Sequence, residues 1–572
     1  MFSNRLSSAL VIVLAGALAS CAGGDAGDEA GAAPGGNVGF GGAQDIGQFR
    51  NILETGGIPG AGTLDAAGFF AEHYVELPPP DCDEALCLQS MLSVGDDWLY
   101  NGYQATLAVA LNTPVDPSTI EPRPRDFVVV VDTSGSMNLD DRIGYVKQGL
   151  ELLVDTLGDE DNLALVTYAS DPIVRAEFAL DAEPAARRAA LHEEIAALEA
   201  GGSTNLYGGL QTGFDLAQAA LEAQTEGREL RVLLLSDGLA TAGITSDESI
   251  IAMAEEYLTL GIGLTTIGVG LDFNVELMRG LAERGAGNFY FLENPAAVSE
   301  VFTEEVTFFA SPLALDVTVE VRTGNGYEVG AVAGTRLWYT EGGVGSIYLP
   351  SVFLASRTST DPGDDKGRRG GGGTLFIEML PTGRTDGELA RVAEVKLRYR
   401  VPGEDTYREQ AISVENPANP GITPEEAYYS HQAMAKQYAM YNLYLGLHQA
   451  AETAAYDYHC ALSLLMDLDQ RAESWNLKLD DADLAADREL IGMFMANLRE
   501  AGAIEVPPEQ ECSGYYYDEP FPYDDDEGCC YDDDVVYGCS AAGGPAGTGA
   551  GLSLMMLLLG ALLVSTRRRR RA

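Results

Sequence analysis

Between residues 127 and 309 the chain alternates short apolar runs with segments whose apolar residues recur at helical spacing. The apolar runs predict strands at 127–131, 163–169, 174–180, 232–235, 264–269 and 288–292. Helical periodicity predicts helices at 141–157, 185–198, 206–221, 249–260 and 275–283, and a last helix that begins at Pro295. Fully apolar strands that alternate with helices are typical of a parallel sheet covered on both faces. We therefore expect an α/β domain over 125–310, with a doubly wound and mostly parallel sheet.

The flanking regions have a different pattern. Residues 43–124 are mixed and form an N-terminal flanking segment, with one predicted strand at 103–111. Residues 311–416 favour a β-rich domain, with a charged, glycine-rich interruption at 361–373 that we interpret as a mobile hairpin tip. Residues 423–505 favour a helical segment that starts with a capping box at Thr423. Predicted helices cover 424–450, 455–470 and 483–501.

The N-terminus carries an export signal over 1–20. Arg5 is followed by an apolar stretch too short to span a membrane comfortably, and small residues then precede Cys21. This junction resembles a bacterial lipobox, which implies cleavage before Cys21 and lipidation of its thiol. Ordinary secretion is the alternative. Residues 21–42 are rich in Gly, Ala and Asp and predict a flexible tether.

The C-terminus carries a second signal. An acidic spacer rich in Tyr and Asp, residues 506–538, leads to Gly538 and Cys539, an apolar run at 550–564 and an arginine block. The 539–572 tail resembles the MYXO-CTERM sorting signals of myxobacterial surface proteins, which implies processing at the Gly538–Cys539 pair. A plain transmembrane anchor is the alternative. Both interpretations predict an exported, membrane-anchored protein of the cell envelope, outer membrane or cell surface.

Composition narrows the classes of partner. The chain has 572 residues, too many for one ordinary domain, and its formal net charge of −52 disfavours nucleic acid. Apart from Cys21 and Cys539, six cysteines remain, and an even number in an exported chain predicts disulfides. Cys82 and Cys87 flank a short loop and can pair locally. The sequence leaves the pairing of the others open.

The pattern D-x-S-x-S begins at Asp132, just after the apolar run 127–131, and includes Ser134 and Ser136. Thr204 lies in a loop that opens a helix, and Asp237 follows another buried strand. All three segments connect strands to helices, so they can meet at the edge of the sheet where ligands bind in open α/β folds. Carboxylate and hydroxyl oxygens suit a hard cation, and no thiol or imidazole is present to favour zinc or copper.

In order and spacing these residues resemble the metal-ion-dependent adhesion site of von Willebrand factor type A domains. The resemblance covers roughly 125–310. It implies direct ligation by Ser134, Ser136 and Thr204, with Asp132 and Asp237 bound directly or through water. It also implies Mg²⁺, or Mn²⁺ or Ca²⁺, as the cofactor, and a protein ligand that presents an Asp or Glu to the metal.

Three functions compete. The first is a metal-dependent adhesion or scaffold protein, anchored to the membrane by the N-terminal lipid and the C-terminal tail. The second is an envelope structural protein with a vestigial metal site. The third is a metal-assisted hydrolase, which needs a general base near the metal; no His lies in the three loops. We expect a protein that is not an enzyme.

Overall fold

The computed structural model describes most of the chain between residues 36 and 512. The described ranges are 36–99, 103–116, 123–179, 182–223, 228–270, 274–292, 294–309, 312–324, 326–360, 368–382, 391–418, 423–505 and residue 512. The predicted signal peptide, Cys21, nearly all of the acidic spacer, and the Gly538–Cys539 tail lie outside these ranges. Within them, no helix combines the length and apolar character that crossing a membrane requires.

The predicted α/β domain contains a seven-stranded sheet in the order β2-β10-β9-β8-β5-β6-β7. Its strands are β2 (Gly42–Ala43), β5 (Arg125–Asp132), β6 (Asn162–Tyr168), β7 (Pro172–Ala176), β8 (Glu229–Ser236), β9 (Gly263–Val269) and β10 (Asn288–Leu292). All neighbours pair in parallel except β7, which is antiparallel to β6 and lies at the edge. The mostly parallel, doubly wound sheet expected from the sequence is confirmed.

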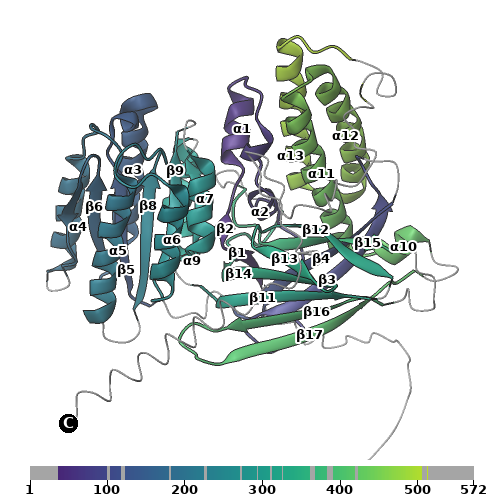
Figure 1. Ribbon diagram of the computed structural model, residues 1–572, viewed down its shortest axis with the longest axis horizontal. Helices are drawn as coiled ribbons and strands as arrows, with labels where there is room; N and C mark the ends of the chain where they lie inside the picture. The colour runs from purple at the N-terminus through teal and green to yellow at the C-terminus, as the bar shows by residue number, and fades with distance from the viewer. Residues whose placement is uncertain are drawn as a thin grey trace, which may run out of the picture. The chain divides into compact units, whose positions relative to one another are not determined.

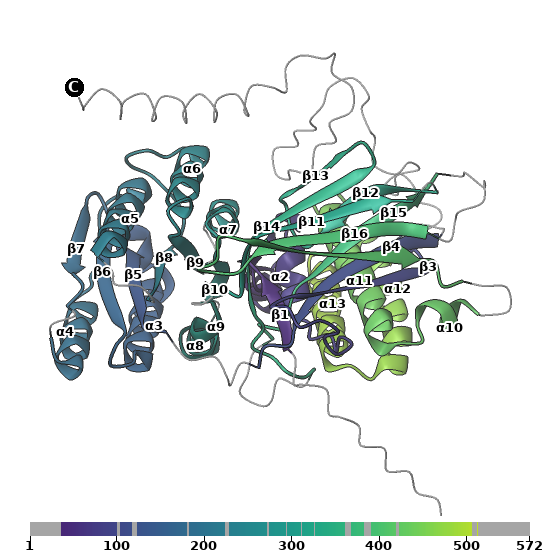
Figure 2. The ribbon, with the colours of Figure 1, turned by 90° about the horizontal axis from the view of Figure 1, so that it is seen from below.

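Helices cover both faces of this sheet (Figure 2). One face packs against α5 (Leu206–Ala223), α6 (Asp247–Leu258) and α7 (Val275–Arg284). The other packs against α3 (Arg142–Thr156), α4 (Pro184–Ala196) and α8 (Pro295–Ser299), followed by η4 (Glu300–Glu305) and α9 (Val306–Phe309). As predicted, Pro295 is the first residue of its helix, and Asn294 caps it by accepting a hydrogen bond from the Ala297 amide.

The second sheet is antiparallel and has ten strands. Its strands are β1 (Gly36–Phe40), β3 (Cys87–Asp96), β4 (Tyr103–Thr113), β11 (Ala314–Thr323), β12 (Tyr327–Ala333), β13 (Trp338–Glu341), β14 (Val344–Leu354), β15 (Thr374–Pro381), β16 (Arg391–Arg400) and β17 (Tyr407–Glu415). The sequence predicted a β-rich domain over 311–416 only. Three of the strands, β1, β3 and β4, lie before the α/β domain in the sequence. They join this sheet because β4 pairs with β15 and β1 pairs with both β4 and β14.

The prediction of a flexible tether over 21–42 was wrong for its described part, 36–42, because β1 is a buried strand and the chain from β1 to β2 contributes to both sheets. After β1 it turns at Gly41, where a Cβ would lie 2.7 Å from the Ser351 Oγ, and at Gly42, whose φ is +114°. Only glycine suits such close packing and backbone geometry. The helices α1 (Gly47–Glu54), η1 (Ala61–Thr63) and α2 (Ala66–Ala71) follow.

The predicted helical segment forms α10 (Pro424–Tyr428), α11 (Gln432–Ala454), α12 (Tyr458–Leu479) and α13 (Ala482–Glu500), of which α11 to α13 lie side by side in Figure 1. The capping box at Thr423 is confirmed, and its partner is Glu426. A single helix over 424–450 was wrong. The chain leaves helical geometry after Tyr428, and His431 then caps α11 by accepting a hydrogen bond from the Ala433 amide.

The prediction of a mobile tip at 361–373 was wrong for its described part, 368–373. Arg369 is buried, and its guanidinium binds Asp45, Glu300 and the carbonyl of Phe291. Arg368 is a largely buried side chain that donates to Asp487 across 2.8 Å. Local composition cannot reveal partners that lie so far away in the sequence.

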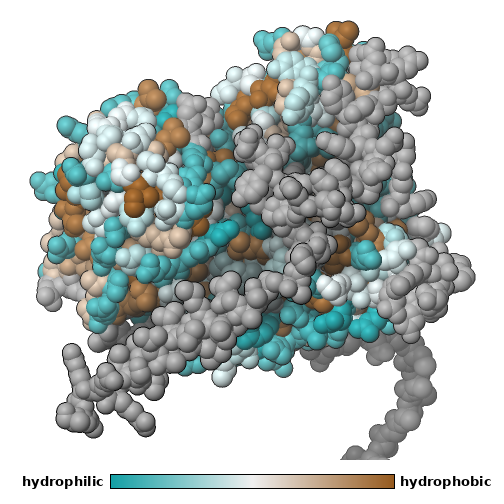
Figure 3. Space-filling model, in the orientation of Figure 1, coloured by the Kyte–Doolittle hydropathy of each residue, from teal (hydrophilic) through white to brown (hydrophobic). Residues whose placement is uncertain are grey.

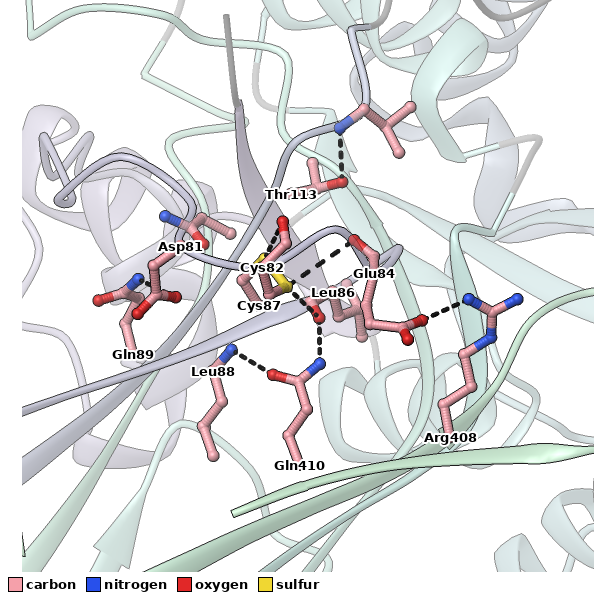
Figure 4. The surroundings of a disulfide bond; sticks show 12 residues. Asp81, Cys82, Glu84, Leu86, Cys87, Leu88, Gln89, Thr113, Arg408 and Gln410 are labelled. Atoms are coloured by element: carbon pink, nitrogen blue, oxygen red, sulfur yellow. Dashed lines mark hydrogen bonds and ion pairs between the residues drawn. A yellow bond between two sulfur atoms is a disulfide. The ribbon is translucent and has the colours of Figure 1, made fainter. Parts of the chain in front are cut away.

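Two disulfides are present in the described residues. Cys82 pairs with Cys87, as predicted, and Cys460 pairs with Cys512, which the sequence left open. Figure 4 shows the first disulfide beside Gln410 of β17. The Gln410 side chain forms hydrogen bonds with the backbone of residues 86 and 88. Disulfides of this kind persist in oxidising compartments.

Candidate metal site

The five residues predicted for the metal site lie in three loops at one edge of the parallel sheet. Asp132 ends β5, Thr204 precedes α5, and Asp237 directly follows β8. Backbone hydrogen bonds join the loops: the Gly135 amide donates to the carbonyl of Gly202 across 3.1 Å, and the Gly201 amide donates to that of Thr133 across 2.8 Å. The convergence expected from the sequence therefore occurs at the carboxyl ends of the strands.

Asp132 is fully buried and held by three groups. The Ser134 amide donates to its Oδ1 across 2.8 Å, and the Ser236 hydroxyl donates to its Oδ2 across 2.8 Å. The hydroxyl of Tyr168, at the end of β6, lies 2.8 Å from the Ser236 Oγ and 3.2 Å from the Asp132 Oδ2. Tyr168 and Ser236 were not among the predicted site residues, although Tyr168 ends β6 and Ser236 directly precedes Asp237.

The electrostatics of the edge favour a bound cation. Burial, together with the negative charge of Asp237, raises the pKa of Asp132 to about 6. Burial and the nearby charge of Asp132 also raise the pKa of Tyr168 well above its ordinary value. The two carboxylates are buried close enough for the charge of Asp237 to disfavour ionisation of Asp132, and a divalent cation would neutralise this negative charge.

The hydroxyls of the D-x-S-x-S loop have the spacing of neighbouring metal ligands. The Ser134 Oγ and the Ser136 Oγ are 3.0 Å apart. In an octahedron with metal–oxygen distances of about 2.1 Å, adjacent oxygens are separated by about 3.0 Å, so this pair fits one edge of a Mg²⁺ coordination shell. Ser134 is buried and Ser136 is half-buried.

Thr204 is held on both sides by the loop that follows Asp237. Its amide donates to the Thr241 Oγ1 across 2.9 Å, and its carbonyl accepts from the amides of Thr241 and Ala242 across 2.9 and 3.0 Å. The backbone of Thr204 is therefore fixed by the loop at the end of β8. Preorganisation of this kind reduces the entropy lost when a ligand binds.

Asp237 is buried, and its two oxygens differ. Oδ2 lies 3.3 Å from the Nη1 of Arg142, whereas Oδ1 has no hydrogen-bond partner among the described residues. A buried carboxylate oxygen without a partner is costly, and a metal ion or a metal-bound water is a natural partner for it. No local sequence pattern singles out Arg142, which occupies the first position of α3.

The donors available at this edge are all oxygens: two carboxylates and three hydroxyls. This set fits Mg²⁺, Mn²⁺ or Ca²⁺ and contains no soft ligand. Elsewhere in the described part of the chain, as here, no three His, Cys, Asp or Glu side chains form a group suited to a metal ion. Two of the five predicted ligands are carboxylates, so hydroxyls must supply the other three.

Comparison with known proteins places this domain in a family. The family model of the von Willebrand factor type A domain matches residues 126–304. These residues are a von Willebrand factor type A (VWA) domain. The match begins in β5 and ends in η4. It contains every strand of the parallel sheet except β2, and all five predicted site residues.

Two relatives of known sequence each match about a third of this chain. Uncharacterized protein YfbK of Escherichia coli (strain K12) is 32% identical over 197 residues, which are 34% of this chain and 33% of YfbK. Calcium-activated chloride channel regulator 1 of Bos taurus is 27% identical over 199 residues, 34% of this chain and 20% of the regulator. The chain thus spans a third or less of the length of these two relatives.

Solved structures that match this chain include a von Willebrand factor type A protein from Catenulispora acidiphila. It is 17% identical, with a TM-score of 0.41, over 68% of this chain and 87% of that one. The pilus adhesin SpaC of Lactobacillus rhamnosus GG is 14% identical, with a TM-score of 0.28, over 58% of this chain and 48% of the adhesin.

Proposed function

We propose that this protein is a non-enzymatic, metal-dependent protein-binding protein of the cell surface, with Mg²⁺ (or Mn²⁺ or Ca²⁺) held at the edge of its VWA domain. Ser134, Ser136 and Thr204 would bind the metal directly, and Asp132 and Asp237 would bind it directly or through water. The observation that carries the proposal is the buried Oδ1 of Asp237, which has no partner among the described residues and lies in an oxygen-only site.

The ligand set supports a protein partner with an acidic side chain. Neutral hydroxyls leave a divalent cation with residual positive charge, and when bound it can accept one more carboxylate at an open position. A hydrolase would need a general base near the metal, and none of the chain's five His lies in the three loops. The site is therefore better suited to binding than to bond cleavage.

The surface around the site supports a protein partner as well. Leu139, Leu239 and Ile244 lie in the loops that contain the site residues, and 54, 46 and 45% of their surface is exposed. On the face shown in Figure 3, apolar residues occur in small groups among hydrophilic ones. Apolar side chains next to a metal can bury apolar surface against a protein partner. A small hydrophilic ligand has no such surface to bury.

The proposed location rests on chemistry and on sequence signals. Two disulfides favour an oxidising compartment. The predicted lipidation of Cys21 and processing at Gly538 and Cys539 would anchor the chain to the envelope. One acyl chain anchors only weakly, so either several acyl chains at Cys21 or a second attachment at Cys539 would be needed for stable retention.

The first test is capture of a partner by the mature exported chain. Immobilised wild-type protein, incubated with surface proteins of the producing cells in Mg²⁺, should retain specific proteins identifiable by mass spectrometry. EDTA should release them, and Asp132→Ala should not retain them. Undiminished retention in EDTA and by Asp132→Ala would contradict the metal-bridged mechanism. The domain would then bind its partner through a surface that needs no metal.

A second test concerns the apolar surface. Leu239→Ser should weaken retention of the captured partner roughly tenfold, as expected from losing the burial of one leucine side chain. It should leave Mg²⁺ affinity unchanged, because Leu239 supplies no oxygen ligand. Leu260→Ser is the matched control: Leu260 is exposed to a similar extent, 45%, but precedes β9 at the opposite edge of the sheet. Equal retention by both variants would exclude Leu239 from the interface.

A further inference from the structure

A buried guanidinium lies beside the candidate metal site. The Arg142 side chain is 3% exposed, and its Nη1 is 3.3 Å from the Oδ2 of the fully buried Asp237. The other oxygen of Asp237 is buried and has no hydrogen-bond partner among the described residues. The guanidinium therefore compensates one carboxylate of the site and leaves the Oδ1 of that carboxylate open.

The backbone is shaped to bring Arg142 to this position. Asp140 and Asp141, which precede it, both have left-handed φ values, +48° and +56°. Such conformations cost free energy in residues other than glycine, and they persist where the surrounding structure requires them. At the end of β9, Gly270 has a φ of +85°, and a Cβ there would lie 2.2 Å from the Nε of Arg142. Two loops thus accommodate this one side chain.

We infer that Arg142 is the counter-ion of the metal-free site, which stabilises the empty VWA domain and lowers its affinity for a divalent cation. The inference rests on the proposed function, because it assumes that a metal binds at Asp132 and Asp237. It assigns Arg142 a role through Asp237 rather than as a ligand.

The sum of charges explains the role. With both carboxylates ionised, Asp132, Asp237 and Arg142 together contribute two negative charges and one positive charge to the metal-free site. A divalent cation must then bind a few ångströms from a buried guanidinium, and like charges repel strongly where water is excluded. The same guanidinium gives the metal-loaded site a net charge of +1, which favours an incoming carboxylate from a partner.

The test is Arg142→Met, which keeps the length and packing of the side chain but removes the charge. Titration of Mg²⁺ into the mature chain by calorimetry should give a Kd about tenfold lower than in the wild type, because the repulsion is gone. The melting temperature in EDTA should fall, since the buried carboxylate of Asp237 loses its counter-ion. Arg142→Lys, which restores a positive charge, should return both quantities toward wild-type values.

The matched control is Arg125→Met. Arg125 starts β5, at the strand end opposite Asp132, and pairs with Asp161 across 2.6 Å with little exposure of either side chain. This variant should melt earlier in EDTA but bind Mg²⁺ with unchanged affinity, because its ion pair lies far from the site. A general loss of stability would therefore not reproduce the effect of Arg142→Met.

Each outcome has one meaning. An unchanged or weaker Mg²⁺ affinity in Arg142→Met, while the wild type binds Mg²⁺, overturns the counter-ion role and leaves the metal site standing. A wild-type chain that neither binds Mg²⁺ nor melts later in its presence overturns the proposed function itself. If Arg142→Met folds only in Mg²⁺, the counter-ion role is supported, because the metal replaces the missing charge. Failure to fold even in saturating Mg²⁺ contradicts it.

Discussion

Asp132→Asn is expected to abolish Mg²⁺ binding without destabilising the metal-free protein. The substitution keeps the size of the side chain and an oxygen that can accept the hydrogen bond from the Ser134 amide. It removes a charge that burial and Asp237 disfavour, as the pKa of about 6 for Asp132 indicates. The melting temperature of the wild type should be higher in millimolar Mg²⁺ than in EDTA, by an increment that grows with metal concentration. The variant should have the same melting temperature in both.

The size of the effect follows from linkage. At a Mg²⁺ concentration 100 times Kd, metal binding stabilises the wild type by about 2.7 kcal/mol, and this contribution should vanish in Asp132→Asn. Differential scanning calorimetry with and without EDTA measures it directly. Asp140→Asn is the matched control: this exposed carboxylate lies in the same loop, and Asn tolerates its left-handed backbone. A metal-dependent shift that survives in Asp132→Asn would exclude Asp132 as a ligand.

The pH dependence of this shift has a definite sign. Since the folded-state pKa of Asp132 is raised from 3.8 to about 6, its stabilising contribution to the metal-free protein is complete below pH 3.8 and is lost as pH rises through about 6. At neutral pH the ionised carboxylate therefore costs the metal-free protein about 3 kcal/mol. Metal binding needs that ionised form, so the Mg²⁺-induced rise in melting temperature should grow between pH 5 and pH 7.

The VWA domain could be predicted from sequence because its signals are local. The apolar run at 127–131 has no polar interruption, which requires a strand buried on both faces, and helical periodicity follows it from residue 141. Topology then places the loops after such parallel strands at one edge. Asp132, Thr204 and Asp237 could therefore be assigned to one place, although they are 105 residues apart from first to last (237 − 132).

The ten-stranded sheet could not be predicted in the same way. Its central strand β1 has five residues, two of them glycines, and its register with β14 matches Val38 to Leu354. Strand pairs separated by some 300 residues leave no local periodicity that names the partner. Arg142 was missed for a similar reason: as the first residue of a helix it looks like an ordinary solvated charge, and only the φ values of Asp140 and Asp141 direct it inward.

Buried ion pairs were also invisible in the sequence, and one of them carries the largest expected effect on stability. Asp483 is 2% exposed, and it accepts from Arg357 across 2.9 Å, from Lys436 across 2.8 Å and from the amide of Tyr74 across 3.0 Å. It thereby joins α13 to α11 and to the N-terminal flanking segment. Burial alone would raise its pKa, but the charges of His73, Lys436 and two arginines outweigh burial and lower the pKa to about 2.

Asp483→Ala is expected to lower the free energy of unfolding by about 3–5 kcal/mol, because Arg357 and Lys436 would remain buried without their shared carboxylate. The control is Asp469→Ala, which removes a half-exposed ion pair with Arg488 and should cost about 1 kcal/mol or less. Urea unfolding in EDTA, followed by circular dichroism, measures both.

Because the pKa of Asp483 is lowered, its stabilising contribution is complete above pH 3.8 and is lost as pH falls through about 2. The difference between wild type and variant should therefore shrink in acid, and equal costs for the two substitutions at neutral pH would show that the buried carboxylate is not the charge that holds these segments together.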